Sequence, residues 1–130
     1  MKAKDEMLHA LRNLSLDRTA VRLMQEDINR IAEDEKQKEL SAVQREALSK
    51  ERMKLESCMV ATANHVARVE RLLALLTEEE QKVLDYTLIS PRPEAVFDLA
   101  AEFNCETTRI YRIRACAVSK LVRLRYGAGE

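Results

Sequence analysis

Hydrophobic residues recur every three or four positions over most of the first 76 residues. A first stripe comprises Val21, Met24, Ile28 and Ile31. A second, longer stripe alternates by four and three over four heptads and comprises Leu48, Arg52, Leu55, Met59, Thr62, Val66, Val69, Leu73 and Leu76. Such spacing places each set on one face of a helix. The longer stripe predicts a coiled-coil seam, in which Arg52 and Thr62 are the polar interruptions.

Two polar segments divide this region. The first helix has a possible break near Asn13 to Asp17, where Asn, Ser and Asp side chains can turn or cap the chain. The charged run from Glu33 to Glu39 ends the first stripe, and we place the reversal between two helices there. A second helix from Leu40 to Leu76 would be roughly 55 Å long, at about 1.5 Å per residue.

The seam of the second helix needs a partner, because a helix of this length cannot bury it alone. It must pack against residues 18 to 33 of the same chain, against a second copy of the chain through residues 48 to 76, or against both. The sequence leaves the homodimer and the intrachain hairpin equally open.

The composition favours helices throughout. The chain has two glycines and two prolines, and residues 1 to 90 contain neither, so nothing there forces a tight turn. Charged residues make up 34% of the chain and aromatic residues 4%, which is typical of amphipathic helices rather than β-sandwiches. We therefore expect an all-α protein, with a long helical hairpin or coiled coil over residues 1 to 76 and a second domain over residues 77 to 130.

The second domain begins with a helix-start signal. Thr77 is followed three residues later by Glu80, the spacing of a capping box in which each side chain bonds the backbone of the other. The helix that follows has an apolar face of Val83, Leu84, Leu88 and Ile89. Ser90-Pro91-Arg92-Pro93 ends it, because the residue before a proline is disfavoured in helical geometry.

Two further helices are predicted, over about 94 to 103 and 107 to 125, in the pattern of a helix-turn-helix. Asn104, in the turn, tolerates left-handed backbone geometry. Ala100 supplies a small residue where the second helix crosses the first, and Glu106 stands before the second helix, so its cap shifts to Thr107. The predicted core of this motif comprises Leu99, Phe103, Cys105, Ile110, Ile113, Val118, Leu121 and Leu124.

The charge distribution points to a nucleic-acid partner. The whole chain has a formal net charge of zero. Between Thr107 and Arg125, however, no acidic residue occurs and six basic ones do: Arg109, Arg112, Arg114, Lys120, Arg123 and Arg125. A local cationic stripe on a neutral protein is typical of a small nucleic-acid contact surface.

The last fifty residues resemble a known family. Asp98 to Cys105 stands where that family carries an acidic residue, an Ile-Ala pair, Glu, Leu and Gly-Val. Ile110-Tyr111-Arg112-Ile113-Arg114, followed by Ala117-Val118 and Lys120-Leu121, aligns without gaps with its recognition helix. On these residues, Leu76 to Leu124 resembles region 4 of bacterial sigma factors and the related domains of phage late-transcription activators of the RinA and ArpU kind. Glu106 replaces the family's Ser or Thr cap, and Ser90 to Pro93 replaces its glycine-containing turn.

The resemblance implies a DNA-contacting set on the recognition helix. Carried over by position, it comprises Thr107, Thr108, Arg109, Tyr111 and Arg112, with Arg114 and Lys120 farther along. Arginine can donate two parallel hydrogen bonds to guanine, while Thr and Tyr can bond phosphate or meet a thymine methyl group. The partners implied are double-stranded DNA and RNA polymerase.

Other chemistry has little support in the sequence. His9 and His65 have no metal-ligand spacing to any cysteine, and we expect no metal and no cofactor. No nucleophile with its base and no phosphate-cradling glycine loop is present, so we do not expect an enzyme. Cys58, Cys105 and Cys116 form no CxxC pair, which indicates reduced thiols and, without a membrane span or signal peptide, a cytoplasmic protein.

The main hypothesis is a DNA-binding transcription regulator, encoded by a phage or prophage. One rival is a small terminase-like subunit that recognises packaging sites, since those also join a helix-turn-helix to oligomerising helices. A second rival is a helical protein-interaction adaptor that does not bind DNA. Oligomer size and salt-dependent DNA binding would separate the three.

Overall fold

The computed structural model describes residues 2–129 and confirms an all-α protein. Within that range it contains five α-helices and no strand: α1 (Lys2–Glu35), α2 (Ala42–Leu73), α3 (Glu78–Leu84), α4 (Ala95–Glu102) and α5 (Thr107–Tyr126). A π-helical turn, η1 (Asp85–Ile89), extends α3, and a 3-10 turn, η2 (Gly127–Gly129), follows α5. The chain divides into two compact units, residues 16–67 and residues 2–15 with 68–129. None of the helices in residues 2–129 is both long and apolar enough to cross a bilayer.

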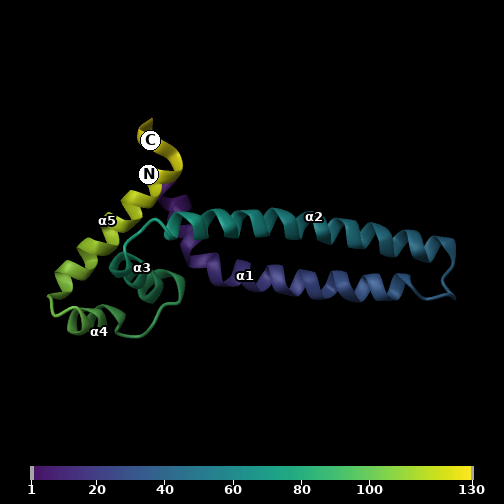
Figure 1. The fold of residues 1–130 in the computed structure, drawn as a ribbon, viewed down its shortest axis with the longest axis horizontal. Helices are drawn as coiled ribbons and strands as arrows, with labels where there is room; N and C mark the ends of the chain where they lie inside the picture. Colours follow the sequence, from purple (N-terminus) through teal and green to yellow (C-terminus); the bar gives the residue numbers. More distant parts are fainter. Residues whose placement is uncertain (1, 130) are drawn as a thin grey trace. The chain divides into compact units, whose positions relative to one another are not determined.

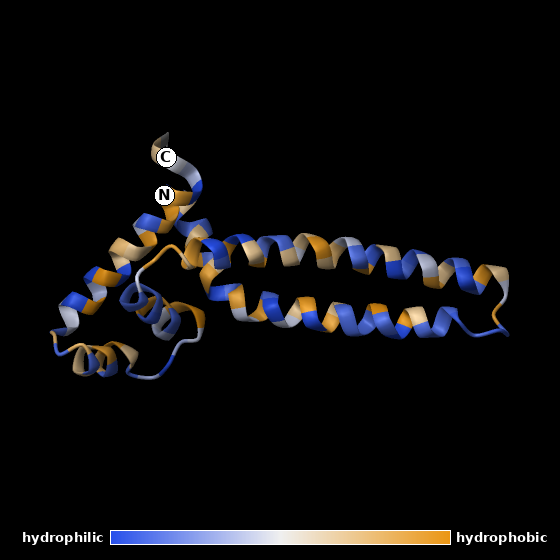
Figure 2. Ribbon diagram, viewed as in Figure 1, coloured by the Kyte–Doolittle hydropathy of each residue, from blue (hydrophilic) through white to orange (hydrophobic). Residues whose placement is uncertain are grey.

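Residues 16–67 form an antiparallel hairpin of α1 and α2 (Figure 1). Both helices alternate hydrophobic and hydrophilic residues along their length (Figure 2). Ile28, Ile31 and Val66 of the predicted stripes are buried. The reversal lies within residues 36–41, as the charged run predicts, because α1 ends at Glu35 and α2 begins at Ala42.

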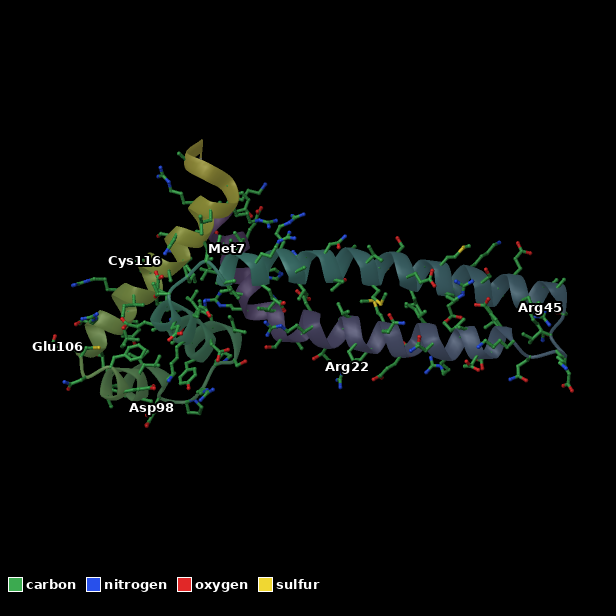
Figure 3. The ribbon with its side chains drawn as sticks, viewed as in Figure 1. Met7, Arg22, Arg45, Asp98, Glu106 and Cys116 are labelled. Atoms are coloured by element: carbon green, nitrogen blue, oxygen red, sulfur yellow. The ribbon has the colours of Figure 1, made fainter. Side chains whose placement is uncertain are left out.

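The hairpin turn is held by side chains that bond the backbone. The Ser41 hydroxyl accepts from the Gln44 backbone N–H at 3.1 Å, and the Gln44 side chain accepts from the Ser41 N–H at 2.8 Å. This reciprocal pair caps the start of α2. Arg45, at the closed end of the hairpin in Figure 3, donates to the carbonyls of Glu35 and Gln37, both at 2.9 Å.

The two polar interruptions of the seam are accommodated differently. Arg52 lies 2.6 Å from Glu35 of α1 and 3.0 Å from Glu56 of α2. The pKa of Arg52 is raised above its ordinary value, and the hydrogen bond to Glu35 is the main cause. The Thr62 hydroxyl donates to the Cys58 carbonyl at 3.0 Å, within its own helix. The Arg52 contact shows that the seam of α2 packs against α1 of the same chain.

The possible break near Asn13 to Asp17 is absent, since α1 continues through it to Glu35. The Asn13 amide donates to the His9 carbonyl one turn earlier at 2.8 Å. The Ser15 hydroxyl donates to the Ile89 carbonyl at 3.3 Å. These side chains therefore make bonds that a continuous helix allows, and they do not turn the chain.

The expected end of the second helix at Leu76 is also wrong, because α2 ends at Leu73. The backbone tightens into 3-10-type turns there. The Leu75 N–H donates to the Leu72 carbonyl and the Leu76 N–H to the Leu73 carbonyl, both at 3.1 Å. Leu76 is buried but lies outside the helix. The last member of the stripe therefore belongs to the connection that leads into α3.

The capping box at Thr77 is confirmed. The Thr77 hydroxyl accepts from the Glu80 N–H at 3.2 Å, and the Glu80 carboxylate accepts from the Thr77 N–H at 2.9 Å. The second bond is the main cause that lowers the pKa of Glu80 below its ordinary 4.5, and Lys120 of α5, 3.4 Å away, lowers it further. The start of α3 is thus tied to α5 as well as to its own cap.

Helices α3, α4 and α5 share one core. Val83, Leu99, Ala100 and Ile110 form its buried centre, and Tyr86, Val96, Phe103, Cys105 and Ile113 pack around it. Residues 2–15 belong to the same unit, where Met7, Leu11 and Leu14 are fully buried. The Tyr126 hydroxyl donates to the Glu6 carboxylate at 2.9 Å and joins the end of α5 to the first turns of α1.

One predicted core residue lies at the surface. Leu121 is fully buried, whereas Leu124 is 46% exposed. Toward the end of α5 the covered side turns to Val122 and Arg125, which are half-buried. The residue three positions after Leu121 therefore lies off the covered side of α5, whereas the residue four positions after it, Arg125, lies on it.

This difference gives a matched pair of substitutions on one helix. We expect Leu121→Ala to lower the free energy of unfolding by about 2–5 kcal/mol, because it leaves a cavity in the core. Leu124→Ala should cost about 1 kcal/mol or less. Thermal and urea unfolding followed by circular dichroism measure both, and equal losses would contradict the burial described here.

Glu80 predicts a pH-dependent contribution to stability. Because its pKa is lower in the folded state, the ionised carboxylate stabilises the fold above pH 4.5, and this stabilisation is lost as the pH falls through the lowered pKa. Glu80→Gln keeps an oxygen for the cap but removes the charge. We expect it to cost about 0.3–1 kcal/mol at pH 7 and nothing once Glu80 of the wild type is protonated. Urea unfolding from pH 7 to pH 3 tests this, with the exposed Glu51→Gln as control.

Candidate nucleic-acid interface

The turn between α4 and α5 has the geometry expected for Asn104. Its φ is 52°, in the left-handed region. The Cys105 N–H donates to the Ala100 carbonyl at 2.9 Å, and the Asn104 N–H donates to the Ala101 carbonyl at 3.3 Å. These two bonds form a Schellman motif, in which a left-handed residue closes the end of a helix. The chain thus leaves α4 and starts α5 within four residues.

Helix α5 begins without a side-chain cap. Its N-cap residue is Glu106, with extended backbone and no capping side-chain bond, so the expected shift of the cap to Thr107 is wrong. Thr107 already has helical geometry as the first residue of α5, which leaves the cap position to the residue before it. The Thr108 hydroxyl donates to the Glu106 carboxylate at 3.4 Å. Figure 3 labels Glu106 at this turn and Asp98 on α4.

None of the seven residues predicted to contact DNA is buried. Five are exposed: Thr108, Arg109, Tyr111, Arg112 and Lys120. Thr107 and Arg114 are half-buried. The opposite side of α5 carries Ile110, Ala117, Val118 and Leu121, all of which are buried. The helix therefore presents one polar side and inserts the other into the core.

The structure divides five of the seven residues between two places. Tyr111 and Arg114 line a hollow of about 290 Å³ together with η1, the loop after it and the start of α4. Arg109 and Arg112 line a second hollow, of about 360 Å³, together with Glu79 and Glu80 of α3. Lys120 also belongs to the α3 side, because its ammonium group lies 3.4 Å from Glu80.

Acidic residues of α3 face part of the basic stripe of α5, and an ion pair also joins α3 to α4. Arg109 lies 3.6 Å from Glu79, and both side chains are largely exposed. Lys82 of α3 pairs with Glu102 of α4, and this hydrogen bond is the main cause that raises the pKa of Lys82. The cluster Glu78 to Glu80 therefore does more than cap α3, since it also lowers the local positive charge beside α5.

Two surface residues of this region carry no signal in the helix-turn-helix pattern. Phe97 on α4 is 68% exposed, and the Arg92 guanidinium stacks on the Tyr86 ring at 3.6 Å from its centroid. Phe97 could have been placed on the surface from its spacing, since Ala95, Leu99 and Ala100 define the buried side of α4. The Arg92 stack joins residues that are six positions apart and follows only from the path of the loop.

The side chains that could bind a metal ion or act as nucleophiles lie apart from one another in the described residues. Within residues 2–129, no three His, Cys, Asp or Glu side chains come together as metal ligands. His9 pairs with Asn13, and His65 lies 4.0 Å from Asp17. The three cysteines are free thiols: Cys58 and Cys116, the latter labelled on α5 in Figure 3, are exposed, and Cys105 is half-buried.

Comparison with known proteins adds no constraint on function. No family model matches the chain, and no curated protein or solved structure is significantly similar to it. The functional argument therefore depends on the geometry of α3, α4 and α5 and on the charges that they carry.

Proposed function

We propose that this protein is a sequence-specific DNA-binding transcription regulator that uses α4, the Asn104 turn and α5 as a helix-turn-helix. The observation that carries the proposal is the position of Arg112, Arg109 and Tyr111, which are exposed on the first turns of α5 directly after the turn. The same helix is anchored by fully buried Ile110 and Leu121. A rigid helix that presents polar side chains on one side is what insertion into a major groove requires.

The exposed side chains have the chemistry that base and backbone recognition needs. Within residues 2–129 Arg112 forms no ion pair, so its guanidinium is available to donate two hydrogen bonds to a guanine edge. Thr108 and Tyr111 offer hydroxyl groups for phosphate oxygens. The N-terminus of α5 lacks a side-chain cap, so its backbone N–H groups can receive a phosphate as well.

The proposed task is promoter recognition of the sigma-like kind. The resemblance of Leu76 to Leu124 to sigma region 4 and to phage late-transcription activators supports it, and so does the presence of a separate helical unit at residues 16–67. In this proposal the hairpin contacts RNA polymerase or a second copy of the chain while α5 holds the promoter. The zero net charge limits non-specific attraction to DNA, so specific contacts must supply most of the affinity.

We expect Arg109→Ala with Arg112→Ala to abolish specific DNA binding while the helical content stays unchanged. A good bidentate contact of arginine to guanine is worth about 1–3 kcal/mol of discrimination, so each arginine that makes one contributes roughly 5- to 150-fold. DNA selected by the purified wild type from a random pool provides the target for fluorescence anisotropy. Arg22→Ala, an exposed arginine on α1 (Figure 3), is the control. Unchanged affinity of the double variant would remove the assigned interface.

The Arg109–Glu79 pair predicts that DNA competes with an internal carboxylate. We expect Glu79→Gln to tighten DNA binding up to about fivefold, because an exposed ion pair is worth about 0.2–1 kcal/mol and the variant no longer repels phosphate. Glu78→Gln, in the same turn of α3, removes the same charge from another position. If both variants tighten binding equally, the gain comes from the change in net charge, and the prediction that Glu79 competes with DNA for Arg109 is wrong.

A further inference from the structure

The hollow beside Tyr111 has features that the proposed role of α5 leaves unexplained. Its walls come from η1, the loop after it, the start of α4 and the first half of α5, and its volume is about 290 Å³. Two arginines, Arg92 and Arg114, and the exposed rings of Phe97 and Tyr111 line it. Glu94 is its one acidic lining residue. The hollow thus combines net positive charge with apolar surface.

Arg92 is held in position by the fold. Its guanidinium stacks on the Tyr86 ring at 3.6 Å, and its backbone N–H donates to the Tyr86 carbonyl at 3.1 Å. Pro91 and Pro93 flank it and restrict the backbone on both sides. A guanidinium stacked on a ring keeps its N–H donors in its own plane, where they can reach an acceptor.

Both guanidinium groups lack a hydrogen-bond acceptor among the residues that the structure describes. No hydrogen bond or ion pair of residues 2–129 involves the side chain of Arg92 or Arg114, apart from the Arg92 stack on Tyr86. Arg114 is half-buried, and a partly desolvated cation without a partner favours an anion nearby. Two such groups at one hollow can bind an oxyanion from two sides.

The aromatic rings indicate that the ligand is more than a free anion. Phe97 is 68% exposed and Tyr111 is 56% exposed, so two rings lie in water at the edge of the hollow. The volume is at the lower end of small-molecule sites, which start at about 300 Å³, and it suits one phosphate with its sugar rather than a large ligand. A sugar phosphate supplies both the charge for the arginines and the apolar surface for the rings.

We propose that this hollow binds one backbone phosphate and its deoxyribose from a DNA strand that borders the groove occupied by α5. Arg92 and Arg114 donate to the phosphate, and Phe97 and Tyr111 pack against the sugar. This inference rests on the proposed function and extends its contact surface to the loop before α4. Arg92 stands in the segment that replaces the family's glycine-containing turn, so the contact does not follow from the sigma-like resemblance.

The first test is the salt dependence of binding to the selected duplex. Loss of one phosphate contact lowers the slope of log affinity against log salt by about 0.9. We expect Arg92→Ala to lower the slope by this amount and to weaken binding about tenfold, the low end for one charged hydrogen bond, on specific and random duplexes alike. Arg92→Lys keeps the charge and should keep the slope, while Arg22→Ala should change neither quantity. An unchanged slope for Arg92→Ala would overturn the proposal.

A second test locates the phosphate. Duplexes are prepared in which one phosphate at a time is replaced by a neutral methylphosphonate. We expect one methylphosphonate position, outside the bases read by α5, at which the substitution weakens binding of the wild type. At this same position it should not weaken binding of Arg92→Ala any further, because that variant has already lost the contact. Phe97→Ala should weaken binding to every duplex without altering the salt slope. Losses that add independently at every position, with no coupling to Arg92, would contradict the assigned contact.

The two proposals fail in different ways. If the wild type binds no duplex even at low salt, the proposed function is wrong and this inference with it. If Arg109→Ala with Arg112→Ala abolishes binding and Arg92→Ala has no effect, only the inference is wrong. Circular dichroism of each variant at the assay temperature confirms that any loss of binding occurs in a folded protein.

Discussion

The direction of α5 depends on one backbone conformation, the left-handed Asn104. Its φ of 52° allows the Cys105 and Asn104 N–H groups to close the end of α4, and the chain then enters α5 with Ile110 already in the core. Most side chains other than Asn and Gly disfavour this conformation because of their Cβ atom. Had α4 continued as one helix through residue 104, Ile110 and Leu99 could not occupy the same core, and the polar side of α5 would have no fixed orientation.

Charge is balanced locally in this unit. Glu79 and Glu80 of α3 lie beside Arg109 and Lys120 of α5, so two of the four basic residues in the predicted contact set are partly neutralised before any partner arrives. Arg92 and Arg114, which line the hollow beside Tyr111, pair with no carboxylate in the described part of the chain. A DNA strand would therefore meet open cations at the hollow and must displace carboxylates at Arg109, which makes the two sides of the proposed interface energetically different.

Local rules were sufficient where a few neighbouring residues determine the structure. The Thr77 and Glu80 capping box, the left-handed Asn104 and the stop at Ser90 each involve bonds or steric limits within about five residues, and all three are present. The same rules failed where a side chain had a competing partner. Asn13 and Ser15 bond the carbonyls of His9 and Ile89 and do not break α1. The spacing rule failed at Leu124 for a different reason, because this residue lies on the exposed side of α5.

The sequence by itself determined the helical class, the limits of most helices and the residues of the core between Val83 and Ile110, because hydrophobic spacing and helix-end signals are local properties. Tertiary structure alone decided that residues 2–15 join the unit of α3 to α5, that Arg52 pairs with Glu35, and that Glu79 faces Arg109. It alone brought Arg92 onto Tyr86 beside Phe97 and Tyr111. Such contacts join residues that are not neighbours in the chain, and their formation depends on how the helices pack, which no local pattern specifies.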